Sequence, residues 1–143
     1  MSTKYLKADA KAYAREHFRG VWAATTTPFR DDLSLDEEGM RRNLRHWIRD
    51  LQLGGLFVSG KQGEFFSMSV AERKRTFELA VEEARGHCGI VTSCSDANLD
   101  VVLELFNAGA SQPPRHPLAG DDGLGDCAGA LQIQRGLHLR VLL

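Results

Sequence analysis

The 143-residue sequence is poor in cysteine and carries no excess of either charge. Its three cysteines, Cys88, Cys94 and Cys127, are odd in number and include no C-x-x-C pair, so we expect neither a disulfide framework nor a zinc site. A metal site made of His87, Cys88 and Cys94 is one interpretation. We favour the other, in which the cysteines are small side chains that are buried or half-buried. The net charge of −1 argues against a nucleic-acid partner, which would need a basic patch.

Long apolar runs are also missing. No stretch approaches the roughly 20 apolar residues of a membrane-spanning helix. The N-terminal stretch MSTKYLKADAKAYAREHF is charged and predicts a helical extension over residues 1–17, without the apolar core of a secretory signal. We therefore expect no membrane partner and a cytoplasmic location. The length allows one ordinary domain, and 43% hydrophobic and 26% charged residues are typical of a globular protein.

Residues 18–110 alternate between short apolar strands and amphipathic helices. Strands are predicted over 20–25, 55–59 and 89–93, and a helix follows each of them. Apolar runs of this kind are typical of a parallel sheet that is buried on both faces and connected by helical crossovers. The expected fold class is α/β, and both a doubly wound sheet and a (β/α)8 TIM barrel begin in this way.

Capping signals and apolar stripes place the three helices. Ser34 and Ser69 each precede a glutamate by three residues, the spacing of a capping box, and the third helix is expected to start near Ser95 or Asp96. The apolar residues that share one face of each predicted helix are Met40, Leu44, Trp47, Ile48 and Leu51, then Phe77, Ala80, Val81 and Ala84, then Leu99, Val102, Leu103 and Phe106.

The composition changes after Ala110. Residues 111–143 hold three of the four prolines and five of the fourteen glycines, and they contain no Lys, Glu or aromatic residue. The adjacent prolines at 113 and 114 cannot supply the ladder donors of the fourth strand that the preceding rhythm predicts. Two interpretations remain open for this tail: a linker or disordered segment, and a change of translation frame in a GC-rich gene.

Polar residues follow all three predicted strands, at 25–27, 60–64 and 92–95. Ligands of parallel α/β proteins bind at the carboxyl ends of strands. The loop VSGKQGEFF has Gly60 and Gly63 on either side of two polar residues, so successive backbone N–H groups can form a nest for a carboxylate. An isolated G-x-x-G-E is more often a tight connection without a ligand.

The surrounding motifs favour a ligand. They are Gly20 with Thr27-Pro28-Phe29, Gly54-Gly55-Leu56-Phe57-Val58 with Gly60-x-x-Gly63-Glu64, and Ser67-x-Ser69-x-x-Glu72-Arg73. In order and spacing, residues of about 18–110 resemble the dihydrodipicolinate synthase / N-acetylneuraminate lyase family of Schiff-base aldolases and lyases. The run Glu64-Phe65-Phe66-Ser67 is also similar to the dehydratase branch that acts on deoxy-keto-glucarate.

The resemblance implies the first three units of a (β/α)8 barrel and a loop for the carboxylate of a 2-keto acid such as pyruvate. The carboxylate-binding residues would be Gly60, Lys61, Gln62 and Gly63, with the backbone N–H groups of the middle two as donors. Further lining of the site would come from Thr26, Thr27, Glu64 and Ser93. The family's usual middle residues are threonines, one of which relays protons, and Lys61 and Gln62 lack that hydroxyl.

The covalent catalyst of the family has no counterpart here. Its lysine lies on the sixth strand and its tyrosine on the fifth, beyond the matching part. Lys61 is an unfavourable nucleophile, because a surface lysine beside Glu64 lacks the desolvation that lowers an amine pKa. It could instead bind a second acid group of the substrate, or it could be a solvated side chain.

We therefore expect an N-terminal part of a pyruvate-type lyase, aldolase or dehydratase that is inactive by itself and has no catalytic residue, cofactor or metal of its own. Full-length members of the family form homo-oligomers, and we expect this chain to aggregate or associate. The alternative is a non-catalytic subunit that binds a keto acid and completes a barrel with a partner, or dimerises.

Overall fold

The computed structural model describes residues 9–111. Its elements, in chain order, are α1 (Ala10–His17), β1 (Trp22–Ala24), α2 (Glu37–Arg45), the π-helical η2 (His46–Asp50), β2 (Gly55–Val58), the 3-10 helix η3 (Phe65–Ser67), α3 (Val70–Ala84), β3 (Gly89–Thr92) and α4 (Leu99–Ser111). The tail from residue 112, with Cys127 and the choice between a linker and a frame change, lies outside the described residues.

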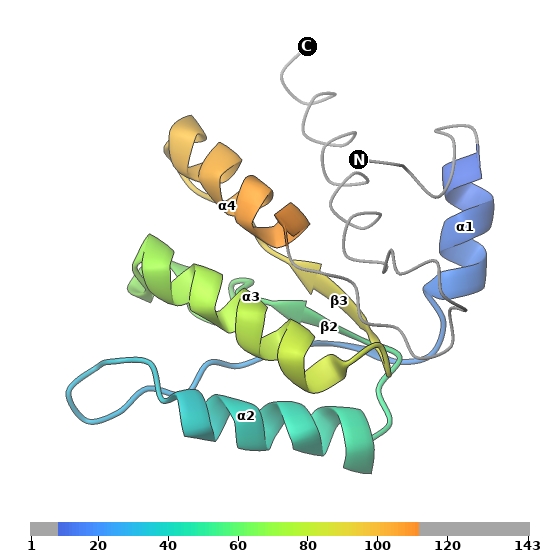
Figure 1. The fold of residues 1–143 in the computed structure, drawn as a ribbon, viewed down its shortest axis with the longest axis horizontal. Coiled ribbons are helices and arrows are strands. Elements are labelled where there is room, and N and C mark those ends of the chain that lie inside the picture. Colours follow the sequence, from blue (N-terminus) through green and yellow to red (C-terminus); the bar gives the residue numbers. More distant parts are fainter. Residues whose placement is uncertain (1–8, 112–143) are drawn as a thin grey trace.

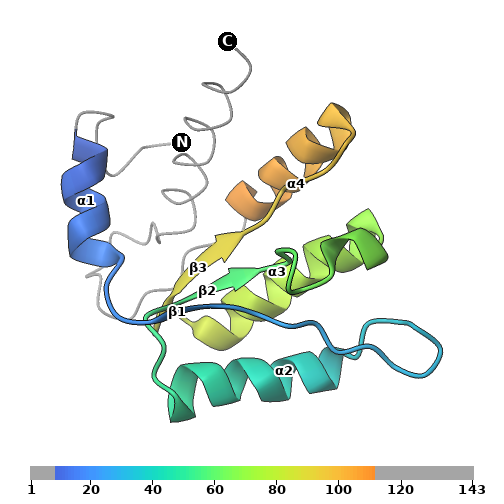
Figure 2. The same ribbon diagram turned by 180° about the vertical axis from the view of Figure 1, so that it is seen from behind.

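The strands form one parallel sheet in the order β1-β2-β3. Ala23 pairs with Leu56, and Leu56 pairs with Ile90. Figure 2 shows β2 and β3 running side by side in the same direction. The predicted α/β class and the parallel pairing are confirmed in this part of the chain. Each strand is shorter than expected; β1 starts after Gly20, whose φ of +79° turns the chain into the strand.

The helices α2, α3 and α4 cover one face of this sheet, with α3 between the other two (Figure 1). Met40, Leu44 and Ile48 from α2 and η2 are buried there together with Phe77 and Ala80 of α3. The apolar stripe predicted for α3 and most of the one predicted for α2 therefore form the core. Helix α1 lies near the amino-terminal ends of the strands, away from α2–α4 (Figures 1 and 2).

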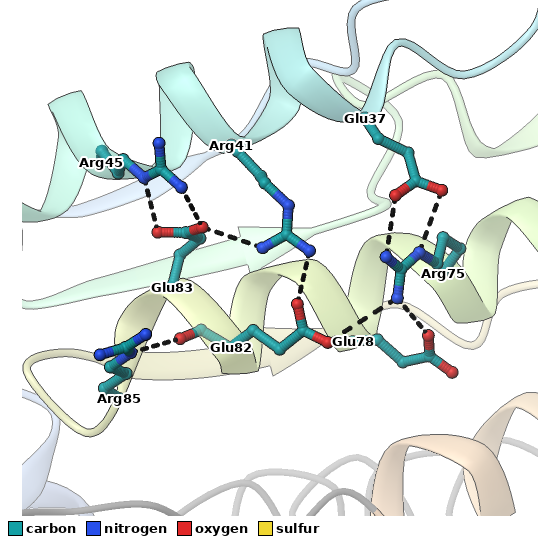
Figure 3. Close-up of polar contacts among 8 residues, drawn as sticks. All are labelled: Glu37, Arg41, Arg45, Arg75, Glu78, Glu82, Glu83 and Arg85. Atoms are coloured by element: carbon teal, nitrogen blue, oxygen red, sulfur yellow. Dashed lines mark hydrogen bonds and ion pairs between the residues drawn. The ribbon is translucent and has the colours of Figure 1, made fainter.

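Oppositely charged side chains join α2 to α3 (Figure 3). Glu83 accepts hydrogen bonds from Arg45 Nε and Nη2, both at 2.8 Å, and from Arg41 Nη1 at 2.9 Å. Arg75 donates to both carboxylate oxygens of Glu37, at 3.1 and 2.8 Å. Bidentate pairs of this kind fix both distance and orientation, so they set how α2 lies against α3.

One of the two predicted capping boxes is confirmed. Ser69 caps α3, accepting from Glu72 N at 3.2 Å, while the Glu72 carboxylate accepts from Ser69 N at 2.8 Å. The prediction for Ser34 is wrong: Ser34 donates to Asp32, and Asp36 is the N-cap of α2, accepting from Gly39 N at 3.0 Å. The chain before Asp36 forms a turn instead of helix, because residues 29 and 35 form an antiparallel bridge and Arg30 N donates to Ser34 O within it.

The predictions for the ends of α2 and for α4 need correction as well. Helix α4 begins at Leu99, because the side chains of Asp96 and Asn98 accept from backbone N–H groups and hold a turn before it. Leu99 and Leu103, which we placed on its inner face, are 63% and 50% exposed, whereas Leu105 is fully buried. Leu51, predicted on the inner face of α2, is also exposed.

Candidate functional site

The loops that follow the three strands meet at the carboxyl-terminal end of the sheet. Thr27 Oγ1 donates to Gly63 O at 2.8 Å and so connects the loop after β1 to the loop after β2. Ser93 N donates to Val58 O at 3.0 Å and connects the end of β3 to the end of β2. Thr27, Gly63 and Ser93 are buried, whereas Thr26 is exposed on the same loop. The structure thus places these predicted lining residues at one strand-end site.

The loop between Gly60 and Phe65 is a compact turn held by its own backbone. Gly63 N donates to Gly60 O at 3.1 Å, and Glu64 N donates to Lys61 O at 3.0 Å. Phe65 N also approaches Gly60 O, at 3.4 Å. Lys61 and Gln62 lie at the exposed tip, and neither backbone N–H has an acceptor among the described residues. Two adjacent free donors are what an anion nest requires.

The reason for the two glycines differs from the one we expected. A φ in the left-handed region is adopted by Ser59, at +54°, and Glu64, at +52°, rather than by Gly60 or Gly63. A Cβ on Gly63 would lie 3.0 Å from Thr25 O and 3.3 Å from Thr27 Oγ1. Gly63 is therefore required by the close approach of the loop to the end of β1.

Ser59 is a functional candidate that the sequence did not reveal, because it lies between the motif residues Val58 and Gly60 and is not one of them. It is fully buried in a left-handed conformation at the start of the loop. Its hydroxyl lies 2.6 Å from Thr76 Oγ1, and Thr76 donates to Arg73 O at 2.7 Å. Because Thr76 has one hydroxyl hydrogen, Ser59 must be the donor of the first bond. This chain of bonds attaches the loop to α3.

The Cys94 thiol, which follows β3, is held in an unreactive state. Burial raises the pKa of the Cys94 thiol, and the nearby Arg73 and Thr92 oppose that shift only partly. The thiol therefore stays protonated and is a poor nucleophile. Lys61 is exposed to solvent. Cys88 directly precedes β3, at the opposite end of the strands, and is half-buried. Within residues 9–111, no group of three His, Cys, Asp or Glu side chains could hold a metal ion.

The residues match the Dihydrodipicolinate synthetase family over positions 17–109. The N-acetylneuraminate lyase of Fusobacterium nucleatum is 34% identical over 87 residues, which are 61% of this chain and 30% of that protein. The N-acetylneuraminate lyase of Clostridium perfringens is 36% identical over 87 residues, with the same coverage. The chain thus spans less than a third of the length of these relatives.

Solved structures agree with the sequence relatives. The crystal structure of the F. nucleatum N-acetylneuraminate lyase has a TM-score of 0.60 at 33% identity, covering 63% of this chain and 31% of that one. The same enzyme complexed with pyruvate has a TM-score of 0.59. The lyase of Mycoplasma synoviae, at 23% identity and a TM-score of 0.64, supports the fold only. No helix among the described residues is long and apolar enough to cross a membrane. The chain belongs to the dihydrodipicolinate synthetase family.

Proposed function

We propose that this chain supplies the substrate-carboxylate site of a 2-keto-acid lyase, aldolase or dehydratase that works through a lysine imine. The observation that carries the proposal is the pair of free N–H groups of Lys61 and Gln62 at the carboxyl end of β2. Family membership and the likeness to an enzyme solved with pyruvate support it. In this proposal the described strands are the first three of a (β/α)8 barrel.

The proposed role of the loop is to bind and orient the substrate. A carboxylate that accepts hydrogen bonds from both N–H groups is held by charge-assisted bonds. The keto carbon next to this carboxylate is then directed toward the carboxyl-terminal ends of the strands. Thr27 and Ser59 fix the loop from two sides, through Gly63 and Thr76. Since both donors belong to the backbone, the loss of the usual threonine side chains leaves this binding intact.

The imine needs a desolvated amine, and none of the described lysines offers one. Lys61 is exposed at the loop tip, Lys74 pairs with Glu104 at 2.5 Å, and Lys11 is exposed on α1. We therefore propose that the lysine and the proton-relaying tyrosine come from barrel strands outside this match, and that the 143-residue chain does not turn a keto acid over by itself.

The second candidate is a non-catalytic subunit that binds a keto acid and completes a barrel with another chain. The observation that favours it is the state of β3, which pairs with one strand only in the described part while α4 beside it exposes Leu99 and Leu103. Size-exclusion chromatography separates the two candidates: a discrete oligomer supports the subunit, and open-ended aggregation supports the incomplete enzyme.

Titration with pyruvate tests the proposed site. The backbone ¹⁵N–¹H signals of Lys61 and Gln62 should shift in a saturable way, while those of α1 at the opposite end of the strands stay unchanged. Acetone, which has the ketone but no carboxylate, is the matched control and should shift neither signal. A chain in which pyruvate moves neither amide would contradict the proposal.

A further inference from the structure

Arg73 is the most deeply buried charged residue at the site, with 1% of its surface exposed. It lies in the first turns of α3, directly below the strand-end loops. Burial lowers the pKa of its guanidinium, and the charge of Asp96 opposes this shift. Placing a guanidinium in such a position costs several kcal/mol of hydration unless its donors are satisfied. Both Nη groups of Arg73 have acceptors, whereas its buried Nε has none among the described residues. The acceptors of this side chain therefore indicate what its burial achieves.

Those acceptors all belong to the loop between β3 and α4. Nη2 donates to Ser93 O at 3.2 Å and to Ser95 O at 2.9 Å, and Nη1 donates to the Asp96 carboxylate at 3.1 Å. Two backbone carbonyls that lie beyond the end of the strand are satisfied in this way. One side chain of α3 thus holds the third strand-end loop in a fixed position.

The same guanidinium also contacts the Gly60–Phe65 loop, in which we propose the carboxylate site. Its central carbon lies 4.9 Å from the ring centroid of Phe65, which directly follows Glu64. Cation–π contacts at this distance are attractive, and they gain strength when they are shielded from water. Phe65 is tied to the loop through its N–H, which approaches Gly60 O. Arg73 therefore lies between two loops that do not follow each other in the chain.

We infer that Arg73 is a positioning residue, which holds the Gly60–Phe65 loop and the Ser93–Asp96 loop in register so that the N–H groups of Lys61 and Gln62 converge on a carboxylate. The role in ligand binding rests on the proposed function, whereas the positioning of the loop does not. A lysine cannot replace this arginine, because an ammonium has neither the planar fork for the carbonyls nor the flat face for the ring.

Helix α3 offers a matched control two residues further on. Arg75 has the same chemistry and sits on the same helix, yet its partners are Glu37 and Glu78 on the side facing α2 (Figure 3). Arg73→Lys and Arg75→Lys both keep the charge and remove the hydrogen bonds of a guanidinium. Only the first of them touches the strand-end loops.

The experiment compares the full 143-residue chain with Arg73→Lys and Arg75→Lys. In the ligand-free protein, Arg73→Lys should displace the ¹⁵N–¹H signals of Lys61 and Gln62 and speed the hydrogen exchange of Gly63 and Glu64, whose N–H groups donate within the loop. It should also weaken pyruvate binding about tenfold, or about 1.4 kcal/mol. Arg75→Lys should leave those signals in place and change the affinity by less than about twofold. Both variants are expected to lower the unfolding midpoint, so stability does not distinguish them.

Phe65→Leu is the second variant, needed if Arg73→Lys does not fold. It leaves the guanidinium and its carbonyl acceptors in place, so Lys61 and Gln62 should move while the amides of Ser95 and Asp96 stay. Unmoved Lys61 and Gln62 signals in the folded variants would overturn the inference. If the wild-type chain does not bind pyruvate, the proposed function fails and the ligand-free signals still decide the role of Arg73.

Discussion

At the scale of single residues, the candidate site depends on backbone position more than on side-chain chemistry. Gly63 accepts from Thr27 Oγ1 and lies against the end of β1, where its added Cβ would be only 3.0 Å from Thr25 O. The tip residues Lys61 and Gln62 have two backbone N–H groups without an acceptor among the described residues, and these donors do not depend on the side chains. This arrangement explains why the spacing of the glycines identified the loop while the residues between them were uninformative.

Gly63→Val should weaken pyruvate binding more than Lys61→Ala does. The valine must push the loop away from Thr25 O and Thr27, which moves both N–H donors, whereas Lys61→Ala keeps every backbone contact. We expect a loss of at least about tenfold for the first change and less than about threefold for the second, as measured by amide-shift titration. If Lys61→Ala is the more damaging change, the loop binds through the Lys61 ammonium, as for a substrate with a second acid group.

Treatment with pyruvate and borohydride should leave the mass of the purified chain unchanged. Imine formation needs an uncharged amine, and Lys61 is exposed to solvent while Lys74 is held by Glu104. Intact-mass spectrometry gives the readout, and a full-length relative with its own lysine serves as positive control. A stoichiometric adduct that peptide mapping assigns to Lys61 would contradict both the proposed inactivity and our view of this lysine.

At the scale of elements, the sequence predicted the strands, their parallel pairing and the stripes of α2 and α3, because burial on both faces and helical periodicity are local signals. It misplaced the start of α2, since Ser34 and Asp36 are both good capping residues and the bridge between Phe29 and Leu35 decides between them. Arg73 appeared only as part of a motif, because its acceptors lie 20 to 23 positions away in the chain.

The two serines with capping-box spacing test whether Ser69 caps α3 while Ser34 does not cap α2. Ser69→Ala should lower the free energy of unfolding by about 1 kcal/mol, because it removes the acceptor for Glu72 N and a partner of the Glu72 carboxylate. Ser34→Ala should cost less than about 0.5 kcal/mol, since its partner Asp32 is in an exposed turn. Urea unfolding followed by circular dichroism measures both, and equal costs would contradict the assignment.

The ion pairs between α2 and α3 predict a dependence of stability on pH. Hydrogen bonds from Arg45 and then Arg41 hold the pKa of Glu83 below its ordinary value of 4.5. The ionised carboxylate is therefore favoured in the folded state, and its contribution is complete above pH 4.5 and is lost as the pH falls through the lower folded pKa. Stability at neutral pH should thus include this contribution, and stability in acid should not.

Glu83→Gln should lower the free energy of unfolding by about 1–2 kcal/mol at pH 7, and the difference from wild type should shrink below pH 4.5. Glu82→Gln is the matched control: its carboxylate also pairs with Arg41 but is about half exposed, so we expect a loss below about 0.5 kcal/mol. Unfolding curves at several pH values give both numbers. A Glu83→Gln deficit that persists unchanged in acid would show that packing, not charge, causes it.

At the scale of the whole molecule, the described residues form a sheet that is not closed. In residues 9–111, β1 and β3 each pair with one neighbour only, so each edge presents a row of backbone N–H and C=O groups. Edges of this kind, next to exposed apolar side chains, are templates for association. The chain covers less than a third of the length of the relatives it matches. In our proposal the other strands of the barrel cover the unpaired edges of β1 and β3.

Our last prediction is that the chain self-associates through the unpaired edge of β3. Leu99 and Leu103 belong to α4, the helix that follows β3, and are 63% and 50% exposed, so they should add apolar area to a contact made on this side of the sheet. Leu103→Lys should shift the purified chain toward the monomer across a concentration series, because a charge on that surface opposes its burial. Leu33→Lys is the control, since Leu33 is more exposed still but lies on the turn before α2. Sedimentation velocity measures both variants against wild type. A wild-type chain that stays monomeric at high concentration, or an equal response to the two lysines, would show that this edge is not the contact surface.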